Sequence, residues 1–127
     1  GRSFESIDEV CSVLSTDSLI MLQQKSEQVF VHDELFGYIV HLTEATRKSD
    51  SLSLGISPRG SIAVLKMAKA HALYQNRDYV VPEDIHKIFF SVCNHRLLLS
   101  TKAKASGLTV EDVLDKILQI VPIPRLS

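Results

Sequence analysis

Apolar residues recur along most of this chain at intervals of three and four positions, with polar residues between them. This spacing places the apolar side chains on one face of a helix. Glycine and proline are few, 5 and 4 of 127 residues, so little interrupts the helical pattern. We expect an all-α fold, a small bundle of about five to six helices. The helical segments begin near residues 6, 15, 32, 57, 81 and 109.

Residues typical of helix N-termini stand at these starts. Ser57 followed by Pro58 gives an N-cap residue and a proline at the first helical position. Capping boxes or acidic first turns open other segments, because side-chain oxygens accept from the free N–H groups and negative charge complements the helix dipole. The residues concerned are Ser6–Glu9, Asp33–Glu34, Pro82–Asp84 and Thr109–Asp112.

The apolar stripes of these segments predict the core. The segment from Ile62 to Tyr74 is apolar or small nearly all round, which predicts the central helix of the bundle. The other residues predicted to face inward are Leu35, Tyr38, Ile39, Leu42, Thr46, Ile85, Ile88, Phe89, Val92, Val113, Leu114, Ile117 and Leu118.

The segments between the predicted helices are predicted to be connectors. We expect a short link at 29–31, a polar loop at 47–54, a flexible basic loop at 100–107 and an extended end at 121–125. In the turn at 75–78, Arg77 and Asp78 are expected to fix the backbone through hydrogen bonds and a local ion pair.

Composition indicates one globular domain, 1–127, with 45% hydrophobic and 23% charged residues. The net charge of −1 offers no positive field for nucleic acid, and no apolar run is long enough for a membrane span. Cys11 and Cys93 are isolated thiols, which suits a cytoplasmic protein. Cys93 and His95 lack a second pair at zinc spacing, so we expect no metal site. The start at Gly1 rather than Met suggests a fragment of a longer chain.

The stretch LGISPRGSIAVL, residues 54–65, nearly spells a phosphate-binding Walker A loop. Gly55 and Gly60 have the right spacing, but Ser61 stands where the motif needs lysine. Pro58 removes one of the backbone N–H groups that would surround the phosphates. No acidic Walker B segment follows either, so this chain by itself is not expected to hydrolyse ATP.

What remains is a helix N-terminus that carries a cation. Arg59 lies in the first turn after Ser57 and Pro58, where free N–H donors and a guanidinium together suit an anion. From the residues alone, a solvated surface Arg59 that tolerates the small penalty of the opposing helix dipole is favoured over the anion site. Arg47, at the end of the third segment, fits either a contact to nucleotide or to a neighbouring subunit, or a simple dipole-complementing role.

The stretch GISPRGSIAVLKMAKAHALYQNRDYVVPEDI resembles the lid subdomain of MoxR-type AAA+ ATPases, relatives of the magnesium chelatase ATPase subunit. The family pattern runs G-A-S-P-R-A, a helix of small and apolar residues, G-R-D-Y-V, then P-E-D-V or P-D-D-I. This chain has Ile56 and Gly60 for the two alanines and Asn76 for glycine. VFVHDELFGYIVHLTEATR, NHRLLL and ILQIVPIPR are similar to its flanking segments, so the resemblance covers roughly residues 17–125 and leaves 1–14 unaligned.

The resemblance implies a role for the arginine. In this family the S-P-R arginine is the sensor-2 residue, which reaches from the lid to the terminal phosphates of ATP; here that is Arg59, with Ser57 and Pro58 setting the helix end. The family also implies an N-terminal AAA+ core with ATP and Mg²⁺, a hexameric ring, and remodelling or activation of a client protein. The isolated domain is expected to hold no cofactor.

Two other functions stay open on the sequence. A free-standing helical adaptor would bind protein through an exposed apolar groove. A helix-turn-helix at 61–95 would bind DNA, but its second helix opens with Glu83 and Asp84, which repel phosphates.

Overall fold

A computed structural model describes residues 16–126, so the helix expected at 6–14 lies outside the described residues. The described part is mostly helical, which confirms the predicted fold class. Its helices are α2 (Thr16–Ser26), α3 (Asp33–Lys48), α4 (Pro58–Tyr74), α5 (Pro82–Arg96), α6 (Thr101–Ala105) and α7 (Val110–Ile120). Its strands are β1 (Leu52–Leu54) and β2 (Leu98–Leu99).

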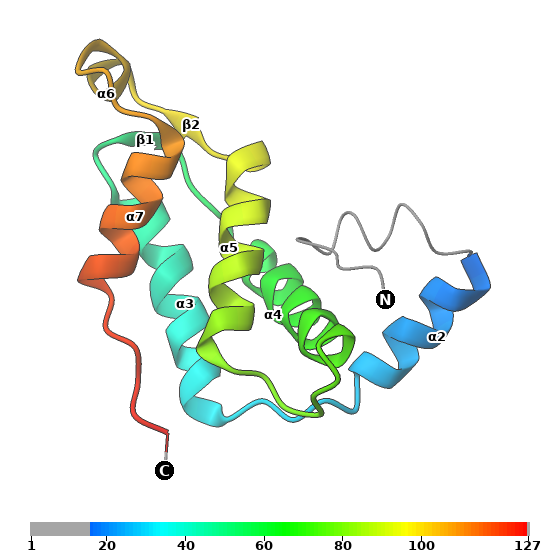
Figure 1. Ribbon diagram of the computed structural model, residues 1–127. Helices are drawn as coiled ribbons and strands as arrows, with labels where there is room; N and C mark the ends of the chain where they lie inside the picture. The colour runs from blue at the N-terminus through cyan, green and yellow to red at the C-terminus, as the bar shows by residue number, and fades with distance from the viewer. Residues whose placement is uncertain (1–15, 127) are drawn as a thin grey trace.

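The bundle is arranged around α3 and α5, which lie between α4 on one side and α7 on the other (Figure 1). α4 packs against α2, α3 and α5, but it lies on one side of the bundle and its Ile62 is exposed, so the prediction that it is the central helix is wrong. α2 contacts α4 and otherwise projects from the bundle (Figure 1). The start of α4 lies beside the end of α3, because the Arg47 side chain binds the carbonyl of Ile56, two residues before α4 begins.

The predicted inward-facing stripes form the core. Leu35, Leu42, Phe89 and Leu114 are completely buried, and the core joins residues of α3, α4, α5 and α7. Of the residues predicted one by one to face inward, Leu118 is partly buried and the others are fully buried. In the segment predicted to be central, Ile62 is exposed and Leu65, Met67 and Leu73 are only partly buried. Two threonines of α3, Thr43 and Thr46, are buried with them. Buried hydroxyls need hydrogen-bond partners, and both threonines find theirs at the start of α4 and in their own helix.

A small sheet corrects the expectation of a purely helical chain. β1 lies in the segment predicted to be a polar loop and pairs antiparallel with β2, with Leu52 opposite Leu99 and Leu54 opposite Leu98. Ser53 Oγ donates to the Leu98 carbonyl at 3.3 Å. Strands this short form only when the fold brings them together, so the sequence pattern did not predict them.

The prediction of a flexible loop at 100–107 is also wrong, because α6 forms within this segment. Ser100 caps this helix by accepting from the N–H of Ala103 at 3.1 Å, and the Ala103 side chain is buried. Gly107, with φ of 77°, turns the chain out of the helix. One buried alanine and a serine cap thus order a segment whose composition is typical of a loop.

Asn76 is the non-glycine residue with a positive φ, 61°, in the described chain. It ends α4: its N–H donates to the Leu73 carbonyl, and the next N–H, of Arg77, donates to the Ala72 carbonyl. The family pattern has glycine at this position. Asparagine tolerates the left-handed conformation better than most other residues, so the substitution keeps the turn.

Several features of the described chain bear on alternative chemistry. Burial raises the pKa of Cys93 to about 12, so its thiol is not a nucleophile or a ready metal ligand; Cys11 lies outside the described residues. Among residues 16–126 no group of three or more His, Cys, Asp or Glu could hold a metal ion. None of the described helices is both long and apolar enough to cross a bilayer.

Candidate functional site

The S-P-R segment forms the start of α4 as predicted. Ser57 is the N-cap, and its Oγ accepts from the N–H of Gly60 at 3.2 Å. Pro58 occupies the first helical position and Arg59 follows it in the first turn. Arg59 is exposed and has no hydrogen-bond or ion-pair partner within the described part of the chain. The guanidinium is therefore available to a ligand or to another part of a larger protein.

The electrostatics of this helix end favour an anion. α2, α3, α5 and α7 each carry acidic residues in their first turns, whereas α4 and the five-residue α6 have none. Pro58 has no N–H, and the serine cap uses that of Gly60, which leaves the N–H of Arg59 without an intrahelical acceptor. The helix dipole and the guanidinium thus add positive potential without a compensating carboxylate. These donors match phosphate oxygens and provide no ligand for Mg²⁺.

The backbone just before the cap is fastened to the last turn of α3. The N–H of Ile56 donates to Thr46 Oγ1 at 2.8 Å, and Arg47 Nη1 donates to the Ile56 carbonyl at 2.7 Å. The Thr46 hydroxyl donates in turn to the Thr43 carbonyl at 2.6 Å. Both backbone groups of Ile56 are therefore held by α3 side chains.

The two glycines that mimic a Walker A loop have steric explanations. A Cβ on Gly55 would lie 2.7 Å from backbone atoms of Thr46 and Arg47, so only glycine lets the loop approach α3 this closely. A Cβ on Gly60 would lie 2.5 Å from Ile56 Cγ2. Ile56 and Gly60 are also the two positions where this chain departs from the G-A-S-P-R-A pattern. The larger residue at 56 occupies the space that an alanine at 60 needs.

This pairing predicts a sign change. Gly60→Ala should lower the free energy of unfolding by about 1 kcal/mol, because overpacking costs about 1–3 kcal/mol and better helix propensity offsets about 1 kcal/mol. In an Ile56→Ala background, where Cγ2 is absent, the same substitution should stabilise the chain by up to about 1 kcal/mol. Urea unfolding of the four proteins measures both effects. The same sign in both backgrounds would contradict the steric account.

A buried carboxylate joins α4, the following turn and α5. Asp84, in the first turn of α5, is fully buried and accepts from both terminal nitrogens of Arg77, each at 2.7 Å. It also accepts from His71 Nδ1 of α4 at 2.6 Å and from the N–H of Val81 at 2.8 Å. Arg77 fixes this turn as predicted, but its ion-pair partner is Asp84 and not the expected Asp78.

The charge state of Asp84 follows from these contacts. Burial alone would raise its pKa, but hydrogen bonds from Arg77, His71 and the Val81 N–H outweigh burial and lower the pKa from 3.8 to about 2. The carboxylate is therefore ionised at neutral pH and stays paired. One bond reaches α4 and the others reach the turn and the start of α5, so the carboxylate links the two helices.

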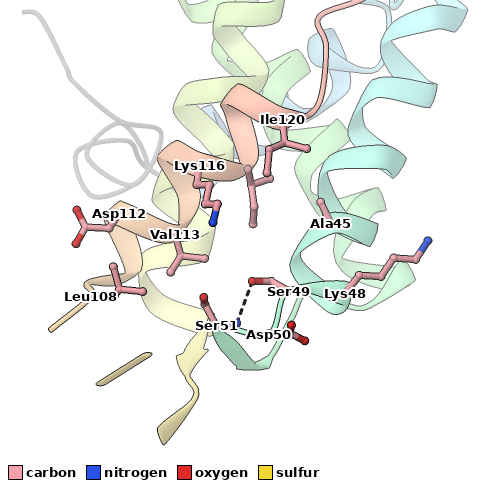
Figure 2. Close-up of a pocket in the computed structure, with 11 residues that line it drawn as sticks. Ala45, Lys48, Ser49, Asp50, Ser51, Leu108, Asp112, Val113, Lys116 and Ile120 are labelled. Atoms are coloured by element: carbon pink, nitrogen blue, oxygen red, sulfur yellow. Dashed lines mark hydrogen bonds between the residues drawn. The ribbon is translucent and has the colours of Figure 1, made fainter. Parts of the chain in front are cut away.

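A cavity of about 490 Å³ lies between the end of α3 and α7 (Figure 2). Apolar side chains of Ala45, Val113 and Ile120 line it, and Lys48 and Lys116 lie at its edge (Figure 2). Neither Ser57, Pro58 nor Arg59 is among its lining residues. The cavity is therefore separate from the cationic start of α4.

The structure brings the candidate residues together in part. One helix start contains Ser57, Pro58 and Arg59. Arg47 binds the carbonyl of Ile56, the residue just before this helix start. Thr46 was predicted to lie in the core, but its bond to the Ile56 backbone was not predicted. The available signal was a buried polar residue in an otherwise apolar stripe, which needs a partner somewhere.

Comparison with known proteins identifies the fold and its relatives. The family model described as the AAA lid domain matches residues 44–117. YeaC, an uncharacterised protein of Bacillus subtilis, is 37% identical over 118 residues, which are 93% of this chain and 37% of YeaC. Chaperone MoxR1 of Mycobacterium tuberculosis is 36% identical over 91% of this chain and 33% of its own length. The crystal structure of a candidate ATPase from Cytophaga hutchinsonii superposes with a TM-score of 0.73 at 32% identity, covering 80% of this chain and 34% of that one.

The chain spans about a third of the length of these relatives. The family match covers more than half of the chain. It includes the end of α3, the S-P-R start of α4, and Asp84 with its partners His71 and Arg77, which we call the Asp84 cluster. The resemblance seen in the sequence is thereby confirmed. The chain belongs to the AAA lid domain family and is a lid of the MoxR type.

Proposed function

We propose that this chain is the C-terminal lid of a MoxR-type AAA+ ATPase and that Arg59 is its sensor-2 residue. The observation that carries the proposal is the exposed arginine at the N-terminus of α4, without a partner in the described chain and without a nearby first-turn carboxylate. A guanidinium there can approach the terminal phosphates of ATP held by the rest of the protein. Ser57 and Pro58 set the helix end that presents it.

The chemistry required of such a residue is electrostatic. Phosphoryl transfer depends mainly on positioning and on cations at the non-bridging oxygens, both of which an arginine on a rigid helix supplies. ATP with Mg²⁺ would be bound by the core of the parent protein, because the donors at the start of α4 suit phosphate and provide no carboxylate for the metal. In this proposal Arg47 belongs to the same site, next to the loop that leads to Ser57.

In this proposal, loss of the terminal phosphate changes the position of the whole lid. Arg59 lies on α4, and the Asp84 cluster fixes α4 to α5 through His71 and Arg77. A force on the guanidinium therefore acts on a connected pair of helices and not on one side chain. Within a hexameric ring in the cytoplasm, this movement would couple hydrolysis to the remodelling or activation of a client protein.

The reading frame that contains this chain and the activity of its parts test the proposal. A Walker A loop and an acidic Walker B strand should lie within about two hundred residues upstream, a distance in line with the typical size of one domain. The longer protein should hydrolyse ATP, while the 127-residue chain alone should show no turnover and little nucleotide affinity. A reading frame without these motifs would contradict the proposal.

One observation favours a second candidate, a protein-binding adaptor. The cavity between α3 and α7 is lined by apolar side chains together with Lys48, Asp50, Asp112 and Lys116 (Figure 2). Such a groove accepts an apolar segment of another protein. A complete reading frame with no ATPase core would support the adaptor, and a core upstream would make the groove a surface of the ATPase lid.

A further inference from the structure

The segment that carries Arg59 is held on both sides by α3. Before it, both backbone groups of Ile56 bind Thr46 and Arg47 at 2.8 and 2.7 Å. After it, Ser61 Oγ lies 2.7 Å from Thr43 Oγ1. A helix start needs only its own cap to be stable, and Ser57 already supplies that cap. The additional bonds fix where the helix start lies relative to α3.

The packing around these bonds leaves little freedom. Thr46 and Ile56 are buried, and Gly55 is in contact with the backbone of α3 so closely that a Cβ would not fit. The hydroxyl of Thr46 both accepts from Ile56 and donates to the Thr43 carbonyl, so its orientation is set by two bonds. The loop cannot shift along α3 without breaking several of these contacts together.

We propose that Thr46 and Arg47 are positioning residues for Arg59: by holding the Ile56 backbone they fix the point from which α4 starts and hence the approach of the guanidinium to phosphate. The inference rests on the proposed function of Arg59. It gives Arg47 a role through Ile56 and not as a direct ligand of nucleotide. Displacement of a catalytic group by about 1 Å can cost about 10²-fold in rate, so loosening this attachment has a measurable effect.

The test uses the full-length ATPase that carries this lid. Thr46→Val keeps the shape of the side chain and removes both hydrogen bonds, and is expected to lower kcat for ATP hydrolysis by about 10-fold. Thr46→Ser keeps the hydroxyl and should restore kcat to within about 2-fold of wild type. Arg47→Met should lower kcat, whereas Lys25→Met, which removes an exposed charge from the last turn of α2, should not. Arg47 is exposed, so its variant keeps the test decisive if Thr46→Val does not fold.

A double-mutant cycle separates positioning from a general structural effect. If Thr46 acts through Arg59, Thr46→Val should have no further effect on kcat in an Arg59→Ala background. Multiplicative losses in the double variant, or wild-type kcat in both Thr46→Val and Arg47→Met, would overturn the inference while leaving the role of Arg59 intact. Wild-type kcat in Arg59→Ala alone would instead overturn the proposed function.

Discussion

In the longer ATPase that we propose carries this lid, Arg59→Ala is expected to lower kcat for ATP hydrolysis by about 10²-fold or more, the usual consequence of losing a cation from the transferring phosphate. KM for ATP should change much less, because in the proposed role Arg59 contacts only the terminal phosphates. Steady-state turnover over a range of ATP concentrations separates the two constants. Wild-type turnover in this variant would remove the sensor-2 assignment.

Two controls isolate the effect of the guanidinium. Lys66→Ala removes an exposed cation from the same helix about two turns further on, and should leave turnover near that of wild type. The unfolding free energy of Arg59→Ala should stay the same or rise by about 0.3–1 kcal/mol, because the arginine opposes the dipole of α4. A loss of turnover together with a loss of stability would indicate a folding defect in place of a catalytic one.

The largest expected effect on stability comes from Asp84→Asn, which should lower the unfolding free energy by about 3 kcal/mol. The substitution keeps the volume but places an amide nitrogen against donors of Arg77 and His71, which then lack a buried acceptor. Arg77 retains 23% side-chain exposure and can partly turn to water, so the loss should stay at the lower end for a broken buried pair. Urea unfolding measures it, with Asp78→Asn in the same turn as the exposed control, expected within about 0.5 kcal/mol of wild type.

The pH dependence of stability gives an independent check on Asp84. Its pKa falls from 3.8 to about 2 on folding, so the native state favours the charged form. The stabilisation is fully present above pH 4 and is lost as the pH falls through about 2, a change of about 2 kcal/mol. The wild-type chain should therefore lose more stability than Asp84→Asn over this interval. Parallel curves for the two proteins would show that the carboxylate is not the group responsible.

Local sequence signals predicted most of the helical frame correctly. Ser57 with Pro58 gave the start of α4, and Thr109 with Asp112 gave a capping box that forms at 3.1 and 2.9 Å. These signals work because a cap and its partner lie within three residues and meet whenever a helix forms. Apolar periodicity likewise predicted which faces of α3, α5 and α7 are buried.

The errors share one cause. β1 and β2 are too short to be stable separately, and each forms because a distant segment supplies its partner. α6 has five residues and depends on burial of Ala103 as well as on its serine cap. Arg77 forms its ion pair with Asp84 and not with the adjacent Asp78, because the turn after Asn76 directs its side chain toward the buried first turn of α5.

By itself, the sequence determined the starts of α2, α3, α4, α5 and α7, the buried stripes of α3, α5 and α7, and an arginine on the first turn of α4. The tertiary structure decided what holds that arginine in place: Thr46 and Arg47 reach Ile56 only because α3 and the loop before α4 cross within contact distance at Gly55. Capping and periodicity depend on neighbours in sequence, and a chain carries them wherever it folds. Hydrogen bonds between elements depend on how the bundle packs, which no short stretch of residues specifies.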